Sequence, residues 1–160
     1  VIGGEICGAD EPIKWLDADG IRGKKNEILE VVVGAVAHSD GDVIYHSIVD
    51  GIFGALQLPD IGQVFKDSDP RWKGATSDRF MVYAKEVMEK RGYTIGNVDA
   101  TIILERPKIG KIVPKMRANI ESLLGVENCV NVKARTAERL GAVGEGRAVE
   151  CHVVLTLVKV

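Results

Sequence analysis

Cysteine, excess charge, long apolar runs and histidine are all scarce in this 160-residue sequence. Its three cysteines form no C-x-x-C pair, which fits a reducing compartment better than a disulfide scaffold. A net charge of −2 provides no basic surface for gripping nucleic acid. No apolar run approaches the ~20 residues that a membrane helix requires. We therefore expect neither nucleic acid nor a membrane as a partner of this otherwise ordinary globular composition.

Short β-branched runs alternate with segments of helical periodicity, which predicts an α/β domain in a two-layer, α+β arrangement. Four or five strands are expected, over residues 1–5, 31–36, 98–104, 130–134 and 148–158. Three helices are expected on one face of the sheet. The first begins after a Ser39 or Asp40 cap and ends at Pro59, the second covers residues 77–91, and the third has Pro114 in its first turn.

Residues 1–160 are expected to form a single domain. The polar, turn-rich residues 6–30 are interpreted as a surface insertion. The opening Val-Ile-Gly-Gly has the character of the middle of a strand, which leads us to expect that a segment preceding it is missing.

The most informative pattern is His38, Asp42, His46 and Asp50, which recur every four residues. On a helix this spacing places the side chains near one another on one face. Imidazole and carboxylate are both good zinc ligands, and a carboxylate can also orient a histidine. The pattern therefore indicates a metal or phosphate site, with a solvated polar face as the alternative.

Further polar residues follow the predicted elements. Asp60-Ile61-Gly62 and residues 65–69 could recognise the hydroxyl groups of a polyol, although aspartates in loops more often make turns. Basic residues at 106–108 and 133–139 follow predicted strands, where ligands commonly bind. They could bind phosphate, and Glu138 could hold a divalent cation.

Several ordered motifs resemble those of the 2-C-methyl-D-erythritol 2,4-cyclodiphosphate synthases of the non-mevalonate isoprenoid route. The resemblance covers roughly residues 31–160. It is carried by Ala37-His38-Ser39-Asp40-Gly41-Asp42-Val43 with His46, Leu58-Pro59-Asp60-Ile61-Gly62, Asp67-Ser68-Asp69-Pro70, Gly92-Tyr93-Thr94-Ile95-Gly96-Asn97-Val98-Asp99, Pro107-Lys108, Asn131-Val132-Lys133-Ala134 and Thr136-Ala137-Glu138.

The resemblance implies a phosphorus–oxygen lyase. It would cyclise 4-diphosphocytidyl-2-C-methyl-D-erythritol 2-phosphate to 2-C-methyl-D-erythritol 2,4-cyclodiphosphate and release CMP. Catalysis would consist of positioning and charge stabilisation, without a protein nucleophile. The resemblance also implies a homotrimer whose sheets pack around the trimer axis and whose sites are shared between subunits.

It further implies a role for each matching residue. His46 would bind zinc, and Glu138 would bind Mg²⁺ or Mn²⁺. His38 and Thr136 would be catalytic, whereas Asp42 and Asp50 would support the site. The substrate would be bound by Ser39, Asp60, Ile61, Gly62, Phe65, Asp67, Asp69, Leu104, Pro107, Lys108, Ile109, Arg135 and Ala137.

The sequence departs from the family in three places. The Asp-x-His that supplies the family's other zinc ligands is absent, so we expect weak or absent zinc here, and inactivity of the chain by itself stays open. Arg135 stands where many relatives have threonine or lysine. Residues 141–147 have a spacing like that of plant and apicomplexan members, which favours a plastid-type stroma over a bacterial cytoplasm. Effector binding in the family's axial channel is in doubt, because Ala142 replaces a phenylalanine.

Two alternatives to the cyclase remain. The missing Asp-x-His leaves room for a non-catalytic trimer that binds nucleotide or isoprenoid diphosphate. A generic metallophosphoesterase is a weaker alternative, and it would form an open-chain product.

Overall fold

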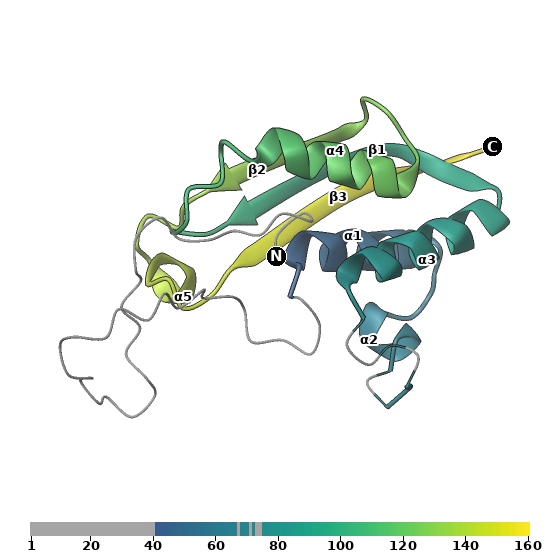
Figure 1. Cartoon of the computed structure of the whole chain (residues 1–160), viewed down its shortest axis with the longest axis horizontal. Helices are drawn as coiled ribbons and strands as arrows, with labels where there is room; N and C mark the ends of the chain where they lie inside the picture. The colour runs from purple at the N-terminus through teal and green to yellow at the C-terminus, as the bar shows by residue number, and fades with distance from the viewer. Residues whose placement is uncertain (1–40, 67, 71, 73–74) are drawn as a thin grey trace.

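The computed structural model describes residues 41–66, 68–70, 72 and 75–160, which form three strands and five helices (Figure 1). The strands are β1 (Tyr93–Ile103), β2 (Val130–Arg135) and β3 (Glu150–Lys159). The helices are α1 (Val43–Ala55), α2 (Ile61–Val64), α3 (Ser77–Lys90), α4 (Val113–Leu124) and α5 (Gly141–Gly144). The predicted strands at 1–5 and 31–36 and the predicted insertion at 6–30 lie outside the described residues. The predicted fold class is confirmed.

The three described strands form one sheet in the order β2-β1-β3. β1 runs parallel to β2 and antiparallel to β3, with Ala100 opposite both Val132 and Val153. The parallel pair is connected through α4, as a parallel connection requires a crossover. Alternate residues of β1, including Val98, Ala100 and Ile102, are buried and so define one covered face of the sheet.

Three long helices cover that face, as predicted. Their apolar residues keep the spacing of one helical stripe and form a single core with the buried residues of the strands. The fully buried members from the helices are Ile44, Ile48, Val49, Ile52 and Phe53 of α1, Met81, Ala84 and Met88 of α3, and Met116 and Ile120 of α4. Within the described residues, no helix is long and apolar enough to cross a membrane.

The last strand, β3, has two contrasting faces. Cys151, Val153 and Leu155 are half-buried and pack against the core. Val154 and Val158 lie on the opposite face, where they are 71% and 51% exposed. The sequence predicted cover on both faces, but the described residues of one chain cover only the face towards the helices.

The helix ends show one wrong prediction and two correct ones. The N-cap of α1 is Asp42, not Ser39 or Asp40, because its carboxylate accepts hydrogen bonds from the N–H groups of Ile44 and Tyr45, both at 3.1 Å. Pro114 lies in the first turn of α4, and Gly125 ends that helix in the left-handed conformation, as expected. Asp42 therefore precedes α1, and the predicted stripe is shorter than its spacing suggested.

Candidate functional site

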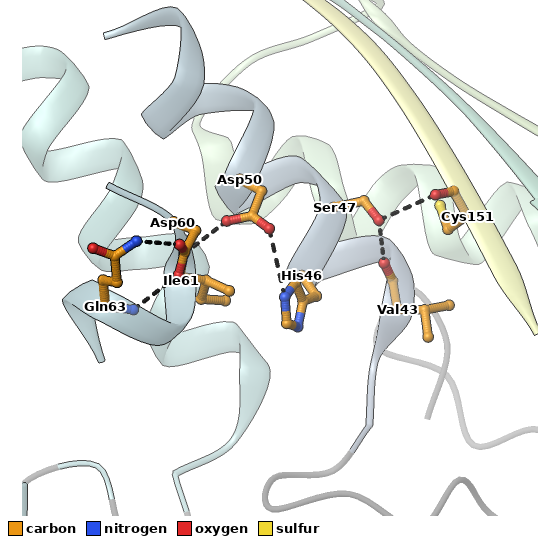
Figure 2. A network of polar contacts seen from close by, with 8 residues as sticks. All are labelled: Val43, His46, Ser47, Asp50, Asp60, Ile61, Gln63 and Cys151. Carbon is orange, nitrogen blue, oxygen red and sulfur yellow. Dashed lines mark hydrogen bonds and ion pairs between the residues drawn. The ribbon is translucent and has the colours of Figure 1, made fainter. Parts of the chain in front are cut away.

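The first part of the candidate site lies on α1 and α2, and we call His46, Asp50 and Asp60 the helix part. His46 and Asp50 are one turn apart, with 3.6 Å between Nε2 and Oδ2 and side chains 59% and 39% exposed. The other oxygen of Asp50 accepts a hydrogen bond of 2.7 Å from the N–H of Ile61 (Figure 2). Asp50 therefore lies between the histidine and the start of α2, which gives its predicted supporting role a geometric basis.

Asp60 is the N-cap of α2. Its carboxylate accepts from the backbone N–H of Gln63 at 2.9 Å and from the Gln63 side-chain amide (Figure 2). These hydrogen bonds, that of the side chain first, lower the pKa of Asp60 below its ordinary value. Asp60 is thus an exposed, ionised acceptor beside the next residues of the loop, Ile61 and Gly62. Ile61 itself is buried, whereas Gly62 is exposed.

Phe65, a predicted substrate contact, is buried in a cluster of aromatic rings. Its ring centroid lies 4.6 Å from that of Phe80, 4.7 Å from that of Trp72 and 5.1 Å from that of Tyr83. The ring therefore anchors the 60–66 segment on α3, and a substrate contact could come only from the backbone. Asp69 is half-buried, and Asp67, like His38 and Ser39, lies outside the described residues.

The second part of the candidate site follows β2, and we call Glu105, Thr136 and Glu138 the strand part. The hydroxyl of Thr136 donates to the carboxylate of Glu138 at 2.5 Å. Glu105, which follows β1, accepts from the N–H groups of Ala137 and Arg139, both at 3.0 Å. One carboxylate from a neighbouring strand end therefore holds the residues on both sides of Glu138.

The backbone of this turn has an uncommon conformation. Glu138 and Arg139 have φ values of 51° and 65°, the left-handed region that side chains with a Cβ rarely adopt. Each such residue costs on the order of 1–3 kcal/mol, and surrounding contacts must hold it in place. Gly144 supplies one of these contacts, because a Cβ there would lie 2.2 Å from the carbonyl carbon of Arg139.

The predicted nucleotide residues lie beside this turn, in the segment from Leu104 to Gly110. Leu104 and Ile109 are buried, and Leu104 donates its N–H to the carbonyl of Arg135 at 3.0 Å. Pro107 follows a cis peptide bond, and Lys108 is exposed. The buried side chains leave backbone groups and Lys108 to meet a ligand. This arrangement is consistent with the expected backbone recognition of a base.

Two basic side chains of β2 lie on the uncovered face of the sheet. Arg135 is opposite Ile103 and Lys133 is opposite Thr101 in the register of β1 and β2. Lys133 donates to Asp99 at 2.5 Å, and Asn131 donates to the same carboxylate at 3.0 Å. Lys133 first and Asn131 second lower the pKa of Asp99. Lys133 is thus engaged with a carboxylate, and the exposed Arg135 is the freer cation.

The two parts differ in how well they suit a metal. Among residues 41–66, 68–70, 72 and 75–160, no group of three or more His, Cys, Asp or Glu side chains could hold an ion. Catalytic zinc usually has three protein ligands, so His46 and the engaged Asp50 do not make a complete zinc site. Mg²⁺ commonly binds one or two carboxylates together with substrate phosphates, and Glu138 fits that pattern. The described residues therefore fit a magnesium site but not a zinc site.

Sequence reasoning missed Glu105 and Gln63. Gln63 could have been found, because it stands three residues after the capping Asp60, as in a capping box. Glu105 carried little signal beyond its place at the end of a predicted strand. Its partners are 32 and 34 positions away, so only the folded chain pairs them.

A comparison with known families gives one clear match. The model of the YgbB family matches residues 27–158 of this chain. Among curated proteins, the chloroplastic 2-C-methyl-D-erythritol 2,4-cyclodiphosphate synthase of Arabidopsis thaliana is 52% identical over 127 residues. That match covers 79% of this chain and 55% of the relative. The chain thus spans only about half the length of that relative.

Bacterial relatives and solved structures agree. The 2-C-methyl-D-erythritol 2,4-cyclodiphosphate synthase of Geobacter metallireducens is 44% identical over 125 residues, covering 78% of this chain and 80% of the relative. The solved structure of IspF from Plasmodium falciparum, a complex with CDP, has a TM-score of 0.70 at 41% identity. That match covers 78% of this chain and 75% of the solved one. The likeness thus extends to both sequence and fold.

Proposed function

This chain belongs to the YgbB family, as its motifs predicted, and on that premise we propose that it is a cyclodiphosphate synthase. It cyclises 4-diphosphocytidyl-2-C-methyl-D-erythritol 2-phosphate to 2-C-methyl-D-erythritol 2,4-cyclodiphosphate and releases CMP. The product belongs to isoprenoid precursor biosynthesis. The reaction makes the protein a phosphorus–oxygen lyase.

The strand part carries this proposal. Thr136 and Glu138 place a hydroxyl and a carboxylate beside the 104–110 segment, which offers backbone groups to a base. A site for a cytidine diphosphate needs both features together, one for the base and one for the diphosphate. The related Plasmodium falciparum structure, which contains CDP, supports the same assignment.

In the proposed reaction, an oxygen of the substrate 2-phosphate attacks the β-phosphorus of the diphosphate. The bond between that phosphorus and the bridging oxygen breaks, and CMP leaves with that oxygen. No protein atom forms a bond to phosphorus, so the chain contributes orientation and stabilisation of charge. The Thr136 hydroxyl would donate to a phosphoryl oxygen, and the ionised Asp60 would accept from an erythritol hydroxyl.

The remaining site residues take the roles that the resemblance implies. His38 and Ser39 would bind phosphate, with His38 stabilising the transition state. The backbone of Leu104, Pro107, Ile109 and Ala137 would bind the nucleotide, and Lys108 and Arg135 would add positive charge. Ile61, Gly62, Phe65, Asp67 and Asp69 would shape the erythritol side.

Glu138 would hold Mg²⁺ or Mn²⁺, which neutralises charge on bound phosphates. His46 would contribute one zinc ligand. Because the described residues do not complete a zinc site, we assign no reaction step to zinc.

A homotrimer follows from the separation of the two parts. α2 and the end of β2 lie on different sides of the molecule (Figure 1). A neighbouring copy could bring its helix part to the strand part of the first and cover the exposed Val154 and Val158 of β3. Val154→Lys should then give a monomer in sedimentation analysis, and an unchanged trimer would refute this use of β3.

The relatives indicate the compartment. The chloroplastic relative is 52% identical and the bacterial one 44% identical, so we propose a plastid-type stroma before a bacterial cytoplasm. Imaging of the tagged protein in its source cells would distinguish these two sites.

The activity is tested by incubating the protein with the diphosphocytidyl substrate, Zn²⁺ and Mg²⁺. We expect release of CMP together with a cyclic diphosphate, identified by mass spectrometry. An open-chain product would indicate a phosphoesterase instead. Absence of CMP release would refute the cyclase.

A second candidate function is nucleotide binding without turnover. The incomplete zinc set of the described residues favours it, together with the absence of Asp-x-His from the sequence. Calorimetry with CDP separates the two candidates when combined with the turnover assay. CDP binding without CMP release would support the binding function.

A further inference from the structure

The turn at residues 136–140 is stabilised by few contacts. Two consecutive residues, Glu138 and Arg139, are left-handed, and the N–H of Leu140 donates to the carbonyl of Ala137 at 2.9 Å. Neither a helix nor a strand fixes this backbone, since β2 ends at Arg135 and α5 begins at Gly141. The position of the Glu138 carboxylate therefore depends on whatever else touches the turn.

Glu105 provides the hydrogen bonds from outside the turn. Its Oε1 atom accepts from the N–H groups of Ala137 and Arg139, both at 3.0 Å. These two peptide groups flank Glu138 on either side. Hydrogen bonds to a carboxylate are about twice as strong as those between neutral groups, so one side chain can stabilise an unfavourable backbone.

Glu105 is itself held by the sheet. The residue before it, Leu104, is buried and donates its N–H to the carbonyl of Arg135 at 3.0 Å, which joins the ends of β1 and β2. Glu105 also begins the exposed part of the 104–110 segment. It therefore ties the turn that bears Thr136 and Glu138 to the segment proposed to bind the nucleotide.

We propose that Glu105 is a positioning residue that presents Thr136 and Glu138 to the diphosphate by holding the peptide N–H groups on both sides of Glu138. It touches neither the substrate nor the cation in this role. Its effect on turnover rests on the proposed cyclase function, whereas its effect on the turn does not.

The test compares two variants of nearly equal size in the full chain. Glu105→Gln keeps an oxygen acceptor, and Glu105→Met removes it. Glu86→Ala, at an exposed site on α3, serves as the control. Circular dichroism and thermal melting check the fold of all three variants.

Hydrogen exchange of Ala137 and Arg139 reports on the turn without any assay of activity. We expect exchange to accelerate by on the order of tenfold to a hundredfold in Glu105→Met, and by about threefold or less in Glu105→Gln. Should Glu105→Met fail to fold, the unmodified protein still gives an answer. In that protein both N–H groups must exchange at least about tenfold more slowly than in an unstructured peptide.

Turnover reports on positioning. In Glu105→Met we expect kcat to fall about tenfold to a hundredfold, with the Kd for CDP changed by less than about threefold. Glu105→Gln should recover most of kcat, and Glu86→Ala should match the unmodified protein. A loss of CDP binding equal to the loss of kcat would indicate general collapse and overturn the proposal.

The outcomes separate this proposal from the cyclase itself. If the unmodified protein releases no CMP, the cyclase fails, and the exchange of Ala137 and Arg139 still tests Glu105. If CMP is released and Glu105→Met changes neither exchange nor kcat, only the role of Glu105 is overturned.

Discussion

The helix part and the strand part of the candidate site are held in opposite ways. His46 and Asp50 stand on a helix whose own hydrogen bonds and buried stripe fix them, whatever surrounds their side chains. Thr136 and Glu138 stand on a left-handed turn that Glu105 holds from another strand. The helix part is therefore robust but incomplete, whereas the strand part is fuller but depends on a few contacts.

The chemistry of the two parts differs in the same way. The helix part offers an imidazole nitrogen, which suits zinc, and the strand part offers only oxygen atoms, which suit Mg²⁺ or Mn²⁺. Two different cations bound independently are therefore the expectation. The predictions below test whether the two parts can be disturbed separately.

The largest effect is expected from His46→Ala. Loss of this nitrogen should remove zinc and lower CMP release about a thousandfold, because a Lewis acid contributes several kcal/mol to charge stabilisation. Zinc per chain from elemental mass spectrometry and the rate of CMP release measure the two effects. His152→Ala, at an exposed site on β3, should leave the zinc content unchanged. Full zinc content in His46→Ala would exclude His46 as a ligand.

The next effect is expected from Glu138→Ala. Turnover should fall about a hundredfold, as when one preorganised charge-stabilising group is removed from a site. The Mn²⁺ concentration that half-saturates the site, followed by electron paramagnetic resonance, should rise while zinc content stays constant. Glu145→Ala, in the following loop, is the control because its partner is Arg147. A parallel loss of zinc would show that the two parts are one site.

A smaller effect is expected from Asp42→Ala, which removes the N-cap of α1. The free energy of unfolding in urea should fall by about 1 kcal/mol, and Asp42→Asn should restore most of it. Hydrogen exchange should accelerate in the first turn of α1 and stay unchanged at residues 136–140. Equal losses in both variants would mean that the buried charge, not the cap, is what matters.

The smallest effect is expected from Asp99→Asn on the uncovered face of the sheet. Because Lys133 lowers the pKa of Asp99 below its ordinary value of 3.8, the ionised carboxylate stabilises the fold above about pH 4. That stability is lost as the pH falls through the lowered folded-state pKa, and the variant should lose less on acidification. Urea titrations between pH 2 and pH 7 would detect it, with Lys133→Met as the matched partner. Identical acid profiles for the three proteins would contradict the interaction.

The regular elements could be predicted from the sequence because their signals are local. The apolar spacing of Ile44, Ile48 and Ile52 predicted α1, and Pro114 and Gly125 marked the two ends of α4. The family motifs also pointed to His46, Thr136 and Glu138 without any structure. These patterns lie within a few residues of chain, where spacing and propensity act directly.

The contacts that arrange the site could not be predicted in this way. Spacing placed Asp42 on the polar stripe, whereas the structure uses it as the cap of α1. Phe65 was expected at the substrate, but packing against the rings of Phe80 and Trp72 buries it. Neither choice can be read locally, because burial depends on α3, which is folded from a later segment.

The sequence by itself determined the family, the order of most described elements and the residue types available for phosphate and metal chemistry. Only the tertiary structure decided which carboxylates serve the backbone and which remain for a ligand. Asp42, Asp60 and Glu105 accept backbone hydrogen bonds, whereas Glu138 accepts only from Thr136 among the bonds described here. The physical reason is that a carboxylate's role depends on which N–H groups the fold brings within about 3 Å of it, and those groups can come from distant strands.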